Sequence, residues 1–205
     1  MAELCEHNLA DLINKYSLST FAETGLGDGH GLDYSRKFPF TRRLSCDVME
    51  VSVDKARFND AFNPVTDSVS LMDAVKFVSS LQGSRTFFEK DYGNVLWWID
   101  AHFPGVDTGI NPWEQTSDDS VITTPLELEE IRKGPSLKDV IIIDDAFLFR
   151  SGLINDKFSD RVPSRYMCNL GKLEPILERF RRTHDIQVRP EGTGSIVLTP
   201  IDEIL

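Results

Sequence analysis

The sequence of 205 residues has only three cysteines, Cys5, Cys46 and Cys168, which form neither a CxxC pair nor a disulfide framework. Positive charge is also scarce, because 22 Lys and Arg stand against 33 Asp and Glu and give a formal net charge of -11. Nucleic acids and anionic membranes are bound by clustered cations. We therefore expect neither partner.

Long apolar runs are absent as well. No stretch approaches the roughly 20 apolar residues of a membrane span, and the first residues lack a basic segment followed by an apolar one. A protein of the reducing cytoplasm is the expectation. No Gly/Ser/Pro linker, repeat or low-complexity tract divides the chain, and its length and 40% hydrophobic content suit a single domain over residues 1–205.

What the sequence does contain is an alternation of short β-branched runs with helical patterns, which is typical of a mostly parallel sheet. The expected strands are 19–23, 44–50, 65–69, 94–100 and 139–144. The expected helices are 2–16, a helix capped by Ser52, a helix starting at 70–73, and 125–133. The runs at 94–100 and 139–144 are almost continuously apolar, which predicts central strands covered on both faces.

The C-terminal part of the sequence has a different pattern. An amphipathic helix over 173–183 precedes two alternating runs, 185–189 and 195–199, which flank the turn from Pro190 to Gly194. This pattern predicts an antiparallel hairpin. The expected fold is therefore α/β, with a mostly parallel sheet of seven strands that ends in an antiparallel hairpin.

The first predicted strand runs directly into the pattern Glu23-x-Gly25-x-Gly27-x-Gly29, here called the glycine loop (residues 23–29). Glycines let the backbone turn tightly and approach a nucleotide-like ligand closely. The loop has no Lys, which disfavours a P-loop, and Glu23 would repel a pyrophosphate but suits a ligand that carries positive charge. A flexible surface turn is the alternative interpretation.

A second carboxylate, Glu50, is expected at the end of the second strand, where it could accept hydrogen bonds from both hydroxyls of a ribose. The order of the glycine loop, Glu50, Ser70 and Asp100 resembles the class I S-adenosylmethionine-dependent methyltransferases. The resemblance covers nearly the whole chain, including the terminal hairpin. It implies a Rossmann-like three-layer sandwich that binds S-adenosylmethionine.

The resemblance also implies roles for particular residues. The three glycines would shape the methionine pocket, Glu50 would hold the ribose, and Ser70 or the neighbouring Asp67 would lie near the adenine. The expected cofactor contacts are Glu23, Gly25, Gly27, Gly29, Glu50, Ser70 and Asp100.

Asp100 closes the fourth predicted strand, and Asp144 and Asp145 close the fifth. Adjacent parallel strands bring their carboxyl ends together, so these three side chains should converge and repel each other unless a proton or a cation intervenes. Oxygen ligands favour Mg²⁺, Mn²⁺ or Ca²⁺. One carboxylate could alternatively act as a general base, and the Asp144–Asp145 pair could instead cap the following turn.

The three aspartates are similar to those of the metal-dependent sugar O-methyltransferases of the macrocin type, in which they serve as magnesium ligands and base. The surrounding sequences, Ile99-Asp100-Ala101-His102 and Asp144-Asp145-Ala146, differ from those of that family. His102 is a candidate base or ligand beside Asp100, since imidazole titrates near neutrality; a loop residue bonded to the backbone is the alternative.

The leading hypothesis is O-methylation of a small molecule or glycan, with Asp100 and His102 as catalytic residues and Asp100, Asp144 and Asp145 around Mg²⁺ or another divalent cation. A sugar- or nucleotide-modifying enzyme without methyl chemistry and a non-catalytic cofactor-binding module remain open. The segments 103–124 and 147–165, which should shape the acceptor pocket, carry no motif. Association into a homo-oligomer also stays open.

Overall fold

The computed structural model describes residues 4–102, 122–134, 138–149 and 170–201. Seven strands form one sheet in the order β3-β2-β1-β4-β5-β7-β6. The strands are β1 (Leu18–Thr24), β2 (Arg42–Asp47), β3 (Asp67–Leu71), β4 (Asn94–Ile99), β5 (Val140–Ile143), β6 (His184–Arg189) and β7 (Ser195–Pro200).

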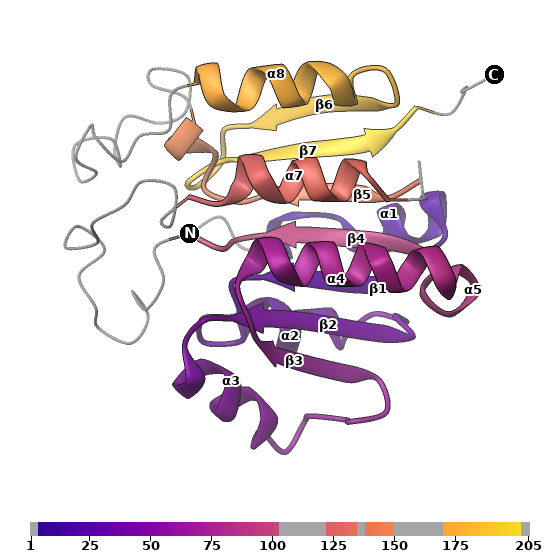
Figure 1. Cartoon of the computed structure of the whole chain (residues 1–205), viewed down its shortest axis with the longest axis vertical. Helices are drawn as coiled ribbons and strands as arrows, with labels where there is room; N and C mark the ends of the chain where they lie inside the picture. The colour runs from indigo at the N-terminus through magenta and orange to yellow at the C-terminus, as the bar shows by residue number, and fades with distance from the viewer. Residues whose placement is uncertain (1–3, 103–121, 135–137, 150–169, 202–205) are drawn as a thin grey trace.

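Strands β1 to β5 are parallel to one another, whereas β7 runs antiparallel to both β5 and β6 (Figure 1). The predicted α/β class, with a mostly parallel seven-stranded sheet ending in an antiparallel hairpin, is thereby confirmed. The order along the sheet changes direction between β1 and β4. Such a switch point, at the carboxyl ends of the strands, is where ligands bind in open α/β sheets.

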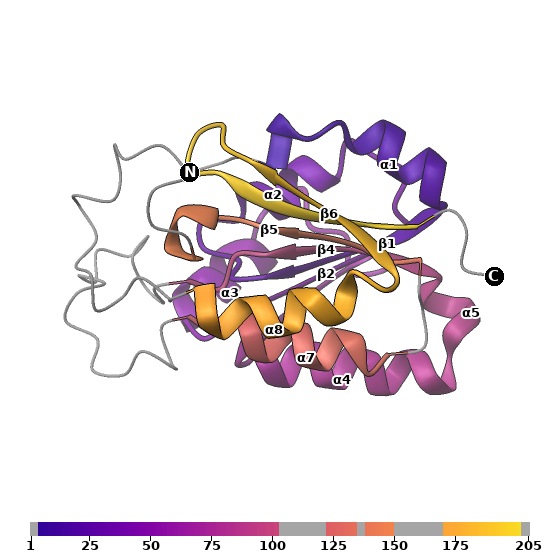
Figure 2. The same cartoon turned by 90° about the horizontal axis from the view of Figure 1, so that it is seen from above.

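Helices lie on both faces of the sheet and make three layers (Figures 1 and 2). Helices α4, α7 and α8 cover one face, while α1 and α2 lie on the other. The helices are η1 (Leu4–Glu6), α1 (Leu9–Tyr16), α2 (His30–Ser35), α3 (Glu50–Arg57), α4 (Ala74–Phe87), α5 (Glu89–Tyr92), α7 (Thr124–Arg132), η4 (Ala146–Phe149) and α8 (Leu170–Phe180). None of the described helices is long and apolar enough to cross a bilayer.

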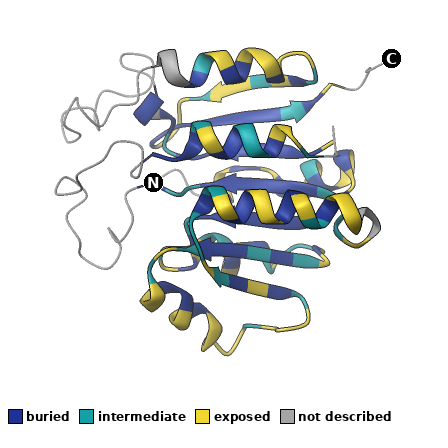
Figure 3. Cartoon of the chain, in the orientation of Figure 1, coloured by how far each residue is buried: buried dark blue, intermediate teal, exposed yellow. Residues whose placement is uncertain are grey.

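The central strands are buried from both sides, as their continuous apolar runs predict (Figure 3). Trp97 belongs to the core cluster shared with α4, α7 and α8, and Trp98 to the cluster shared with α1. The two indoles thus point to opposite faces, because side chains alternate along a strand. Cys46 is buried in the first cluster, as expected for a small core residue.

Several element boundaries differ from those predicted. The segment 2–16 is divided, because the Asn8 side chain accepts a hydrogen bond from the Asp11 amide and caps α1. The second strand ends at Asp47 and not at Glu50, since Val53 and Ala56 bury one face of a helix that begins at Glu50. The third strand extends to Leu71, and Asp73 caps α4.

Candidate functional site at the carboxyl edge of the sheet

The glycine loop follows β1 and leads into α2. Gly25, Gly27 and Gly29 all have positive φ angles, of 79°, 52° and 85°. Side chains disfavour this conformation, so glycine is needed at each of these positions. The loop is fastened to the end of β2, because the amides of Gly25 and Leu26 both donate to the Cys46 carbonyl at 3.0 Å.

Gly25 also meets the end of β4. A Cβ atom at this position would lie 2.6 Å from the Asp100 carbonyl carbon and 2.8 Å from the Ala101 Cα, closer than van der Waals contact allows. The glycine loop and the backbone that carries Asp100 are therefore in direct contact. The two features that the sequence predicts as cofactor loop and catalytic carboxylate thus lie side by side.

Asp47, at the end of β2, is the carboxylate that sequence reasoning missed. Its Oδ2 accepts a hydrogen bond from the Gly27 amide at 2.9 Å, and its Oδ1 accepts one from the Met49 amide at 2.8 Å. Glu50, the predicted strand-end carboxylate, is instead the exposed first residue of α3. The expectation that Glu50 closes the strand is wrong, because Val48 and Met49 lead into the helix and do not prolong the strand.

Glu23 points into the protein. Only 1% of the residue is exposed, and Oε2 accepts a hydrogen bond of 2.7 Å from the Ser45 hydroxyl. Its carboxylate packs against Gly31 of α2, where a Cβ would collide with it. Burial raises the pKa of Glu23 to about 8, although the Ser45 hydrogen bond opposes this shift.

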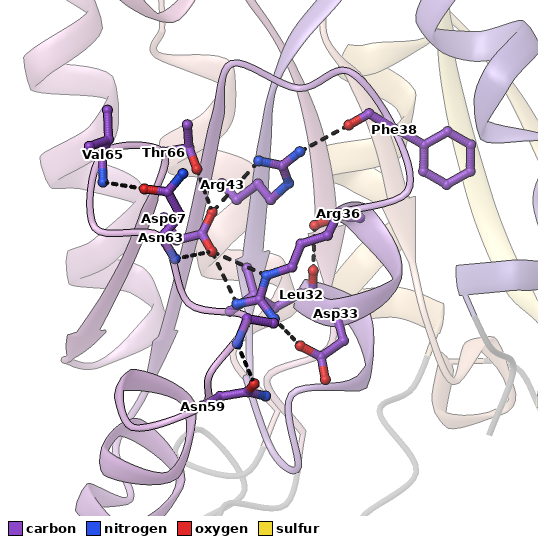
Figure 4. A network of polar contacts seen from close by, with 12 residues as sticks. Leu32, Asp33, Arg36, Phe38, Arg43, Asn59, Asn63, Val65, Thr66 and Asp67 are labelled. Carbon is purple, nitrogen blue, oxygen red and sulfur yellow. Dashed lines mark hydrogen bonds and ion pairs between the residues drawn. The ribbon is translucent and has the colours of Figure 1, made fainter.

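Ser70 lies near the carboxyl end of β3, paired with Cys46 of β2. Asp67, the alternative candidate for the adenine site, begins the same strand and so lies at the opposite edge of the sheet. There it accepts hydrogen bonds from Arg36 and from the Asn63 amide and forms an ion pair with Arg43 (Figure 4). This expectation for Asp67 is wrong, since its side chain is used in a structural network.

Asp100, His102 and Asp145 form a group in which one potential ligand atom of each residue lies within 4.8 Å of the others. His102 Nδ1 is 3.8 Å from Asp100 Oδ1. The imidazole is buried, with 2% of the side chain exposed, whereas the Asp100 side chain keeps 30% of its surface. Asp144, the third predicted metal ligand, lies outside this group.

Asp144 is the most deeply buried of the strand-end aspartates, with 1% of the residue exposed. Burial raises its pKa to about 10, and the charges of Asp100 and Asp145 add to the effect. The pKa of Asp100 is also raised by burial, while the proximity of His102 lowers it. For His102, burial lowers the pKa, but Asp100 and Asp145 outweigh that effect and raise it.

Two further polar residues of α7, which sequence reasoning missed, lie near the site: Thr124 contacts His102, and Glu127 is bonded to Thr123. His102 Nε2 forms a hydrogen bond of 3.1 Å with the Thr124 hydroxyl, which fixes the ring. Glu127 is fully buried and accepts a hydrogen bond of 2.6 Å from the Thr123 hydroxyl. Burial raises the pKa of Glu127 as well. The available signal is a pair of threonines at the start of an amphipathic helix, with an acidic residue one turn later.

Unsatisfied polar atoms concentrate at this edge. Among the described residues, six buried side-chain nitrogen or oxygen atoms lack a hydrogen-bond partner, and all but Arg43 Nε lie at or next to the ends of β1, β4 and β5. The five are Thr24 Oγ1, His102 Nδ1, Glu127 Oε2, Asp144 Oδ1 and Asp145 Oδ1. Buried polar groups are normally hydrogen-bonded, so this concentration is expected of a place that binds a ligand.

The predicted acceptor segments, 103–124 and 147–165, fall mostly outside the described residues. At their borders, Ile122 forms an isolated bridge with His102, and the Phe149 ring packs edge-on against the imidazole at 5.8 Å. Both contacts are made with His102. The described residues of both segments thus lie beside the site.

No family model and no curated protein matches the sequence. Solved structures do match the fold. A putative caffeoyl-CoA O-methyltransferase from Staphylococcus aureus is 13% identical, with a TM-score of 0.62 over 98% of this chain and 85% of that one. SAH-bound methyltransferase PaMTH1 from Podospora anserina is 12% identical, with a TM-score of 0.57 over 95% and 76% of the two chains.

Human methyltransferase-like protein 13, in complex with SAH, gives a TM-score of 0.56 at 12% identity over 97% of this chain and 78% of that one. The protein therefore has the Rossmann-like fold of the class I methyltransferases, which confirms the fold that the resemblance implied. At such low identity the likeness extends to the fold alone. Activity has to be argued from the site.

Proposed function

We propose that the protein is an S-adenosylmethionine-dependent methyltransferase that methylates a hydroxyl group of a small molecule or glycan. One observation carries this proposal. The glycine loop touches the backbone of Asp100 at Gly25, so a cofactor in the loop would lie beside the strand-end carboxylates. Methyl donor and proton acceptor would then be adjacent, which is the alignment that an in-line displacement needs.

The glycine loop fits the cofactor in shape and charge. Three alternating glycines with positive φ leave backbone surface uncovered, and Asp47 at the end of β2 stands where a ribose could be held. Val48 and Leu71 expose 47% and 49% of their surface at the ends of β2 and β3, next to Ser70, and offer an apolar site for the adenine. Glu23 is buried behind the loop with its pKa raised to about 8, so it holds a proton at neutral pH and does not select the ligand by charge.

S-adenosylmethionine, when bound, supplies a methyl group on a positively charged sulfur. The chain's own residues align the acceptor and remove its hydroxyl proton. Asp100 is suited to this task because its carboxylate is partly exposed while its raised pKa keeps it basic enough to hold a proton. His102 is too buried to touch the acceptor and acts through Asp100.

A divalent cation would add to this chemistry by lowering the pKa of the acceptor hydroxyl. The donor set fits such an ion, since Asp100, His102 and Asp145 gather oxygen and nitrogen atoms, and two of these residues have a buried atom without a partner. Asp144, which the sequence predicts as a ligand together with Asp100 and Asp145, lies outside this donor set.

Calorimetric titration of S-adenosylmethionine into the full chain tests the cofactor, and production of S-adenosylhomocysteine with a panel of hydroxyl acceptors tests the reaction. Asp100→Asn should lower turnover about 10²–10⁴-fold, as loss of a general base does, with cofactor affinity nearly unchanged. Absence of cofactor binding would exclude methyl transfer. Binding without turnover on any acceptor would favour the non-catalytic module.

A further inference from the structure

The potential ligands that lie together at the carboxyl edge of the sheet differ in one residue from the three carboxylates that the sequence predicts. The group is Asp100, His102 and Asp145, and it contains a nitrogen donor. We propose that this group binds a first-row transition-metal dication through two carboxylates and His102 Nδ1, with Asp144 outside the ligand set. The inference deepens the proposed function, because the ion would lie beside the proposed cofactor pocket.

The orientation of His102 supports its role as a ligand. Nε2 is engaged with the Thr124 hydroxyl at 3.1 Å, which leaves Nδ1 facing Asp100 at 3.8 Å. Histidines that bind metals characteristically use the second ring nitrogen in such a hydrogen bond, which fixes the tautomer. A separation of 3.8 Å suits two ligands of one ion, because bonds of about 2.0–2.2 Å place neighbouring ligand atoms roughly 3–4 Å apart.

Burial provides a second, independent argument. His102 Nδ1 and Asp145 Oδ1 are both buried without a hydrogen-bond partner among the described residues. Leaving such atoms unsatisfied is costly, and a cation between them would satisfy both at once. Asp100 would need only one carboxylate oxygen for the ion, which leaves the other to accept the proton of the acceptor.

The nitrogen donor determines the class of ion. Imidazole suits Zn²⁺, Fe²⁺, Ni²⁺ and Cu²⁺, whereas sites for Mg²⁺ are built from oxygen. A site with one imidazole and two carboxylates should therefore prefer the transition metals over Mg²⁺. This differs from the magnesium site that the sequence predicts from its aspartates.

The test is calorimetric titration of Co²⁺ and of Mg²⁺ into the full chain after removal of bound metal with a chelator. We expect Co²⁺ to bind at least about tenfold more tightly than Mg²⁺. His102→Gln should weaken Co²⁺ binding by about tenfold or more, as loss of a ligand does. Asp144→Asn is the matched control, since Asp144 lies outside the ligand group, and it should change the Co²⁺ affinity less than about threefold.

Equal affinities for the two ions, no binding of either, or a loss with Asp144→Asn as large as with His102→Gln would overturn the inference. If His102→Gln fails to fold by circular dichroism, electron spin-echo modulation of Mn²⁺ on the unchanged chain gives the answer. Coupling to an imidazole ¹⁴N is expected, and its absence overturns the assignment. S-adenosylmethionine titration of the same samples reports separately on the proposed function.

Discussion

Strand β5 has a buried carboxylate at each end, Asp139 before it and Asp144 after it, and the surroundings of the two differ. At the amino end, Asp139 accepts hydrogen bonds from both terminal nitrogens of Arg85, at 2.6 and 2.9 Å, and from Trp97 and the Val95 amide. At the carboxyl end, Asp144 and Asp145 each keep a buried oxygen without a partner.

The carboxylate at the amino end of the sheet stabilises the fold, whereas those at the carboxyl end belong to the candidate site. Asp139 and Arg85 are both almost fully buried, and their charges are balanced by each other and by neighbouring donors. At the carboxyl end Asp100, Asp144 and Asp145 lie together, and burial with the neighbouring aspartates raises the pKa values of Asp100 and Asp144. A buried charge needs a partner. The amino end has one from its own chain, while the carboxyl end is arranged for one from outside.

The largest effect should come from breaking the satisfied end. Asp139→Asn removes the negative charge and leaves Arg85 as a buried cation without its partner, which should cost about 3–5 kcal/mol of unfolding free energy. Urea denaturation followed by circular dichroism measures this loss. Asp60→Asn, at an exposed position, is the control and should stay within about 0.5 kcal/mol. Equal stability of the two variants would show that the Arg85–Asp139 ion pair does not stabilise the fold.

Two glycines, one in the glycine loop and one inside α4, give a second contrast. Gly25→Ala places a Cβ against the Asp100 backbone at a positive φ, so we expect a cost of about 1–3 kcal/mol and loss of cofactor binding. Gly83→Ala is the matched control, because no atom lies within 4 Å of the added Cβ and Gly83 is inside α4. It should raise stability by about 0.5–1 kcal/mol. Destabilisation by both variants to the same extent would contradict the close approach at Gly25.

The unsatisfied end should make stability depend on pH. The pKa of Asp144 is raised to about 10 in the folded protein, against an unfolded value of 3.8. Between these values the folded state binds one more proton than the unfolded state, so stability falls as pH rises. Asp144→Asn should remove this fall, which linkage sets at about 1.4 kcal/mol for each pH unit between the two pKa values. Thermal melts of both proteins across this range measure the difference, and parallel curves would refute it.

The sequence predicts the strands of this sheet better than it predicts which polar side chains meet at the strand ends. The apolar runs of β4 and β5 fixed the two strands to within a residue or two, and the positions of Asp100 and Asp144 follow from where those runs stop. Asp47 was missed because the apolar residues Val48 and Met49 suit a strand as well as the approach to a helix, so the strand was predicted to continue to Glu50. The pairing of His102 with Asp145 depends on how the chain turns after each strand, where Asp145 adopts a φ of 50°. Nothing in the local sequence predicts that turn.

The smallest effect concerns the two acidic residues near the end of β2. Asp47 lies in the strand end and binds the Gly27 amide, whereas Glu50 is exposed on α3. Asp47→Asn should therefore weaken S-adenosylmethionine binding by about tenfold, since a carboxylate roughly doubles the strength of a hydrogen bond from a hydroxyl. Glu50→Gln should change the affinity less than about twofold and the stability by less than about 0.5 kcal/mol. Calorimetric titration of both variants decides between the two residues, and a larger loss with Glu50→Gln would return the ribose contact to the position predicted from the sequence.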